Sequence, residues 1–213
     1  MKTQFIFFVI CLTLVNCKEP QPKLTFKYSN KPELVNCGDE NSKLLNEAIY
    51  NLEEILIKNY VSKNPNLTYA YRAFLKESTN NRTNYNTISN QHALDIFESL
   101  KRIEGLWINK DNNLSLNYNH DIFNCISNNI KDQDLKSTFN ALLSTNSMSI
   151  RMLKDVLVSK SSRLNTDKYL ATYVALELYY SKLSNVDLSK TQETPKDQKL
   201  KKEKDPHAGH NHG

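Results

Sequence analysis

Apolar residues recur every three or four positions along most of the chain between residues 43 and 184, a spacing typical of amphipathic α-helices. In the first such stretch, Leu45, Ala48, Ile49 and Leu52 follow Ser42, which is a suitable helix cap. Alternating runs typical of strands are missing from the sequence, apart from a short extended piece at residues 114–116. The pattern predicts an all-α fold, a single helical domain of about six or seven helices over residues 36–186. The expected helices span residues 43–61, 67–78, 88–103, 121–130, 132–143, 149–160 and 166–184.

The last expected helix, residues 166–184, is apolar on two sides and should be central. Its tyrosines form either an aromatic groove or, as we favour, core packing with hydroxyls at the rim. Glu177 is the lone carboxylate on this helix. It is a buried acid with a raised pKa, an acid that faces a gap reached by solvent, or part of a narrow polar edge with Lys182 and Thr166, and the polar edge is the interpretation we favour. The four tyrosines of this expected helix are Tyr169, Tyr173, Tyr179 and Tyr180.

The chain begins with an apolar run over residues 5–15, which is too short to span a bilayer and suits the core of a secretory signal. Leu14-Val15-Asn16-Cys17 follows, and this segment resembles the lipobox of bacterial lipoproteins, although Asn16 departs from the usual small residue. The resemblance implies that residues 1–16 are removed, that Cys17 carries acyl chains such as palmitate, and that the protein is anchored to the outer membrane. Whether it faces the periplasm or the cell surface stays open. The competing interpretation is an ordinary signal peptide.

Removal of the signal would leave Cys37 and Cys125 as an even pair in an exported domain, where oxidation is favoured. We expect a disulfide between them, and the alternative is two separate buried thiols. Residues 17–35 contain several prolines and charges and are expected to form a tether.

Composition changes after residue 186, and residues 187–213 are expected to be a disordered, lysine-rich tail. The tail ends with His207, His210 and His212 in the spacing H-x-x-H-x-H, which lets three imidazoles reach one Cu or Zn ion. The alternative is a tail that binds metal only in vitro. Calorimetric titration with and without residues 205–213 would measure this binding.

Only four glycines occur in 213 residues, so the clustered glycines of phosphate-binding loops, dinucleotide folds and nucleophile elbows cannot be present. His92 and His120 have no convincing catalytic partner in the sequence, and a structural role is favoured for both. A net charge of +5 with lysines concentrated in the tail argues against a nucleic-acid partner.

These observations favour a lipid-anchored envelope protein that acts as a binding or interaction module, with a protein partner in the envelope and a role in metal handling through the tail as candidates. A helical envelope enzyme, with a site assembled from residues distant in sequence, is the alternative.

The lipobox resemblance makes a direct prediction. Cys17→Ser removes the thiol that would receive the lipid, so the variant should leave the membrane fraction, and intact-mass measurement should show the loss of the acyl chains. Membrane fractionation that is unchanged by the substitution, with a wild-type mass free of acyl chains, would contradict the anchor.

Overall fold

The structure, a computed structural model, describes residues 24–61, 64–110 and 113–191. This part of the chain forms the all-α domain that the sequence predicts, with eight α-helices and one small β-hairpin. The α-helices are α1 (Asp39–Tyr60), α2 (Leu67–Ser78), α3 (Tyr85–Ile88), α4 (Gln91–Leu100), α5 (Asp121–Asn129), α6 (Gln133–Ser144), α7 (Ile150–Ser159) and α8 (Lys168–Val174).

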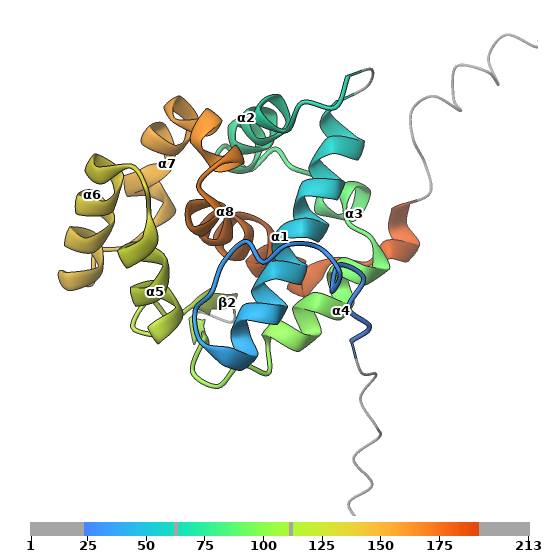
Figure 1. Ribbon diagram of the computed structural model, residues 1–213. Coiled ribbons are helices and arrows are strands. Elements are labelled where there is room, and N and C mark those ends of the chain that lie inside the picture. The colour runs from blue at the N-terminus through green and yellow to red at the C-terminus, as the bar shows by residue number, and fades with distance from the viewer. Residues whose placement is uncertain (1–23, 62–63, 111–112, 192–213) are drawn as a thin grey trace, which may run out of the picture.

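Helices α1 and α8 occupy the middle of the fold (Figure 1). Helices α5, α6 and α7 lie on one side of this central pair, and α2, α3 and α4 lie on the other. The apolar stripe of α1 is fully buried, as Leu45, Ile49, Leu52 and Leu56 show. Helix α8 is buried almost all round, which agrees with its two apolar stripes and accounts for its central place.

The chain continues from α8 without leaving the helical path, but its hydrogen bonding changes. A π-helical turn spans Ala175–Tyr179, and a 3₁₀ helix spans Tyr180–Asn185. One further 3₁₀ helix, Ser161–Asn165, precedes α8. Another, Leu188–Thr191, ends the described part of the chain. The structure therefore extends to residue 191, five residues beyond the expected domain end, and residues 192–213 lie outside the described part.

A two-stranded antiparallel hairpin pairs β1 (Trp107–Lys110) with β2 (Asn113–Leu116), where only a short extended piece was expected. Each strand has four residues, too few for alternation to be visible in the sequence. The expected extended piece at residues 114–116 is therefore part of a small hairpin within the all-α fold.

The helix expected over residues 88–103 also ends early, at Leu100. The indole N–H of Trp107 donates to the carbonyl oxygen of Leu100 at 2.8 Å, and the Ile103 amide donates to the same oxygen at 3.1 Å. In a continuing helix the amide of residue 104 would occupy that oxygen. A turn through Gly105, at φ +75°, then leads into β1. A tertiary contact of Trp107 thus replaces the last helical turn.

The N-terminal segment, residues 24–35, was expected to belong to the tether but instead packs against α1. Leu24 and Val35 are buried at its two ends. The carboxamide oxygen of Asn46 accepts the amides of Leu34 and Val35 at 2.5 and 3.2 Å, so α1 supplies hydrogen bonds that the irregular segment cannot make for itself.

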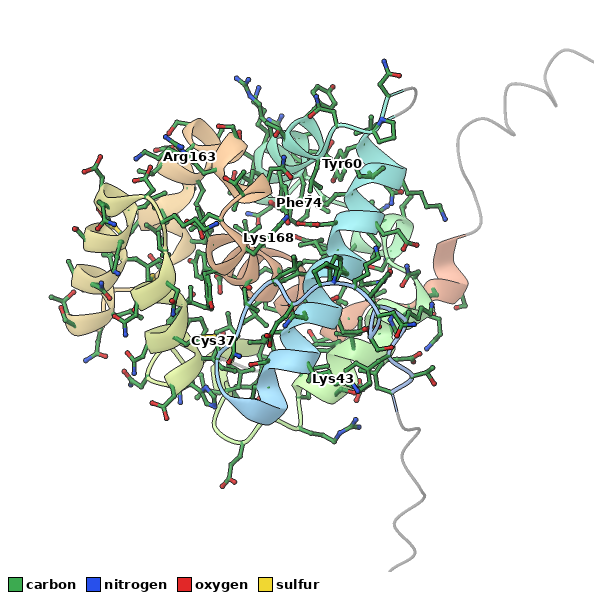
Figure 2. All side chains as sticks on the ribbon, in the orientation of Figure 1. Cys37, Lys43, Tyr60, Phe74, Arg163 and Lys168 are labelled. Atoms are coloured by element: carbon green, nitrogen blue, oxygen red, sulfur yellow. A yellow bond between two sulfur atoms is a disulfide. The ribbon has the colours of Figure 1, made fainter. Side chains whose placement is uncertain are left out.

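The disulfide between Cys37 and Cys125 ties the start of α1 to α5, and the two Cα atoms lie 5.5 Å apart. Cys37 lies where the N-terminal segment passes α5 (Figure 2). They are the two cysteines that remain if Cys11 and Cys17 belong to the expected signal and lipobox. The bond closes a separation of 88 residues, for which the chain-entropy model gives about 4–5 kcal/mol of stabilisation.

Glu47 is the most heavily bonded buried acid of the domain's N-terminal half. Its side chain is 2% exposed, and its two oxygens accept the backbone amides of Lys27 and Tyr28 at 2.6 and 3.1 Å. The Nε2 atom of buried His92, on α4, lies 2.7 Å from Oε1 of the same carboxylate. This one side chain therefore joins the N-terminal segment, α1 and α4, and it gives His92 the structural role that the sequence favours.

Glu47→Gln should lower the free energy of unfolding by about 1–3 kcal/mol, because a carboxamide has one acceptor oxygen and its NH₂ group would face a buried N–H donor. Denaturant unfolding of the oxidised protein measures the loss. The matched control is Glu98→Gln, which removes an exposed ion pair with Lys101 and should change stability by less than about 1 kcal/mol. Equal effects of the two substitutions would contradict the role assigned to Glu47.

Candidate functional site

A cavity of about 470 Å³ lies between the hairpin, the turn that precedes α7, and the helical run that follows α8. Apolar side chains from three separate elements line part of it, and polar side chains line the rest. The apolar residues are Ile108, Leu114, Leu116, Met148 and Ile150. The polar residues are Ser115, Asn117, Tyr118, Asn119, Asn146, Ser149, Glu177, Ser181 and Lys182.

Glu177 provides the acid of this cavity from within the π-helical turn Ala175–Tyr179. The Tyr118 hydroxyl donates to its Oε2 atom at 2.8 Å. Burial raises the pKa of Glu177 above 4.5, and the Tyr118 hydrogen bond and the Lys182 charge offset this only in part. Glu177 is thus a partly buried acid at a cavity that Lys182 also lines, whereas Thr166 is not part of this lining, so the polar edge favoured from the sequence was wrong in including Thr166.

Two buried tyrosine hydroxyls accompany this carboxyl group. Burial, together with the negative charge of Glu177, raises the pKa of Tyr118 and of Tyr173 well above 10. The Tyr173 hydroxyl is completely buried beside Tyr118, and within the described part of the chain it has no hydrogen-bond partner of good geometry. Since buried polar groups are nearly always hydrogen-bonded, an unpaired hydroxyl here marks the cluster as unusual.

Glu177 lies within the π-helical turn Ala175–Tyr179. The extra residue in a π turn rotates the side chains that follow it relative to an uninterrupted α-helix, and such turns recur at functional sites. The other tyrosines of this run keep to the core: Tyr179 donates to Ser89 Oγ at 3.0 Å and Tyr180 donates to the Ala48 carbonyl at 3.1 Å. The sequence interpretation is therefore correct in placing Tyr173, Tyr179 and Tyr180 in the core, but the hydroxyl groups of Tyr173 and Tyr180 are buried rather than at the rim.

The structure does not bring His92, His120 and Glu177 together. His92 is paired with Glu47, away from the cavity. His120 caps α5, where its Nδ1 atom accepts the Ile122 amide at 3.1 Å, and it lines a different hollow of about 560 Å³ beside Leu24. The charged side chains of that hollow, Arg102 and Glu104, are exposed to solvent. The cavity at Glu177 is therefore the candidate site.

The sites expected near the two ends of the chain, Cys17 and His207, His210 and His212, lie outside the described residues. Within residues 24–61, 64–110 and 113–191, no three His, Cys, Asp or Glu side chains are grouped so as to hold a metal ion. Over the same ranges, no helix has both the length and the apolar character needed to cross a membrane.

Comparison of this chain with models of known protein families, with curated proteins and with solved structures found no match.

Tyr118 and the turn residues Asn146 and Met148 were not expected at a site. Tyr118 belongs to an asparagine-rich stretch that carries no motif, and the turn before α7 meets the hairpin only in three dimensions. Glu177 was singled out in the sequence because it interrupts an apolar helix, and that interruption was the one signal of the site.

The raised pKa of Glu177 predicts a pH dependence of stability. Its folded-state pKa lies above the unfolded value, so folding is favoured most below about pH 4.5 and this contribution is lost as the pH rises through the folded-state pKa. The other ionisable groups that act on it are Tyr118, Tyr173, Lys182 and Tyr85, and burial raises the pKa of Tyr85 to about 12. The tyrosines thus stay neutral in this range.

As the pH rises from 4 to 8, the wild type should therefore lose unfolding free energy relative to Glu177→Gln, by about 1.4 kcal/mol for each unit of pKa shift. The reason is that, at position 177, only the wild type has a proton to lose. Denaturant unfolding across this range measures the difference. The exposed Glu104→Gln provides the control. A pH-independent difference for Glu177→Gln would show that this carboxyl group is not buried in the folded protein.

Proposed function

We propose that this protein is a lipid-anchored protein of the bacterial outer membrane whose helical domain binds a small molecule in the cavity at Glu177. The observation that carries the proposal is a carboxyl group with a raised pKa that lies at a cavity beside two buried tyrosine hydroxyls. Ionisable groups with displaced pKa values that gather at a cavity are typical of binding and catalytic sites.

The cavity's size and lining support a small ligand. Its volume of about 470 Å³ falls within the range of roughly 300–1,000 Å³ that is usual for small-molecule sites. Apolar side chains from the hairpin and from the turn before α7 form its walls, and a few polar groups converge on it, as in most such sites. A binding role is preferred to an enzyme because neither His92 nor His120 reaches Glu177 to act as its catalytic partner.

The anchor would hold this domain close to the membrane. Leu24, the first described residue, is buried and lies seven residues after Cys17, a length that spans at most about 25 Å. The Cys37–Cys125 disulfide is in keeping with an exported, oxidising compartment. The histidine-rich tail would supply a separate metal site outside the described residues, independent of the cavity.

A cavity-filling substitution tests the binding function. Ser115→Trp places a large side chain at a residue that lines the cavity, in a strand that suits aromatic residues, and should abolish binding. Asn109→Trp, an exposed position on the other strand of the same hairpin, is the matched control and should leave binding unchanged.

The probes are cyclohexylamine, hexanoate, glucose and the dipeptide leucyl-leucine, each followed by ligand-observed NMR against the purified full chain. Circular dichroism checks that both tryptophan variants remain folded. We expect at least one probe to bind the wild type and the Asn109 variant but not the Ser115 variant. If no probe binds, or if Ser115→Trp binds as the wild type does, the cavity is not a small-molecule site.

A further inference from the structure

Two opposite charges line the cavity, and they lie at different depths. Glu177 is partly buried and bonded to Tyr118, whereas Lys182 is exposed to solvent. The two residues are five positions apart on one helical run, and the Lys182 charge acts on Glu177. Among the described residues that line the cavity, these two are the only charged side chains, so a ligand meets an anion on a partly buried side chain and a cation on an exposed one.

The uncharged lining is of two kinds. Ile108, Met148 and Ile150 offer apolar surface from the hairpin and from the start of α7. Asn119 and Asn146 offer carboxamides, each of which can both donate and accept hydrogen bonds, as a peptide group does. A ligand that matches this lining has apolar side groups and amide bonds between its charged ends.

We propose that the cavity binds a short zwitterionic peptide with apolar side chains, its free amine directed toward Glu177 and its free carboxylate toward Lys182. This inference rests on the proposed binding function and names the chemical class of its ligand. An ammonium group can donate to the carboxylate oxygen that Tyr118 does not occupy, and the apolar side chains are removed from water against Ile108, Met148 and Ile150.

Binding of the amine should depend on pH. The peptide ammonium pairs with ionised Glu177, and burial raises the pKa of that carboxyl group, so affinity should fall as the pH drops through the raised pKa. Tyr118, Tyr173 and Tyr85 are neutral over this range, and Lys182 repels an amine at any pH below its own deprotonation.

Four related probes separate the two charges. They are leucyl-leucine, its C-terminal amide, its N-acetyl derivative, and the N-acetyl amide, titrated calorimetrically into the full chain at pH 7.5. The first carries both charges, the second only the amine, the third only the carboxylate, and the fourth neither. Leucyl-leucine should bind most tightly, and removal of either charge should weaken binding about tenfold or more, since each charge would lose a hydrogen-bonded ionic partner.

Two variants assign each charge to its residue. In Glu177→Gln, acetylation of the amine should weaken binding less than twofold, although it costs about tenfold in the wild type. In Lys182→Gln, amidation of the peptide carboxylate should likewise weaken binding less than twofold. Glu104→Gln and Lys58→Gln, both at exposed positions, are the matched controls and should retain the full wild-type response to each modification.

The outcomes separate this inference from the function on which it rests. If acetylated and free dipeptide bind the wild type equally well, or if Glu177→Gln responds as the wild type does, the peptide assignment is wrong. If leucyl-leucine fails to bind while cyclohexylamine, hexanoate or glucose binds and is blocked by Ser115→Trp, the cavity is a small-molecule site for another class of ligand. If none of the probes binds, both proposals fail.

Discussion

The polar side chains that α1 carries into the core are the constraint on which the fold depends. A buried polar group destabilises the folded protein unless it is hydrogen-bonded, so each of these side chains requires a partner from elsewhere in the chain. Glu47 obtains the N-terminal segment and His92, and Glu53 obtains Tyr71 from α2 and Lys168 from α8. Figure 2 shows Lys168 near the centre of the domain, where α8 lies beside α1. The surrounding elements thus lie where they can hydrogen-bond to the polar side chains of α1.

A second buried acid, Asp167, joins separate segments in the other half of the domain through its hydrogen bonds. Asp167 is 1% exposed, and its two oxygens accept the amide of Leu170, which caps α8, and the amide of Lys131, in the connection between α5 and α6. The disulfide at Cys37 and Cys125 adds a covalent tie between this half and the start of α1. The hydrogen bonds of Glu47 and Asp167 and the Cys37–Cys125 disulfide therefore fix the relative positions of segments that apolar contacts, which are not directional, would hold less specifically.

Glu177 differs from these structural acids in its surroundings. Glu47 and Asp167 each accept a backbone amide at both carboxylate oxygens, so the polypeptide itself occupies them. Glu177 has one tyrosine hydroxyl as its bonded partner, a raised pKa, and a cavity beside it. The comparison separates two acids that hold the fold together from one that lies at a cavity, and it is the reason why we propose the binding site at Glu177.

The sequence by itself determined the helical class and the positions of most helices, because a repeating apolar spacing and local caps such as Asn66, Asn90 and Asp132 act within a few residues. It also pointed to the pair Cys37 and Cys125 and to the unusual character of Glu177. Only the tertiary structure decided three features. Helix α4 ends where the Trp107 indole donates to the Leu100 carbonyl oxygen, residues 24–35 pack on α1, and Tyr118 donates to Glu177 at a cavity. Each of these depends on a side-chain contact outside the helical spacing, over seven positions between Leu100 and Trp107 and over 59 between Tyr118 and Glu177, and such contacts leave no periodic signal in the order of the amino acids.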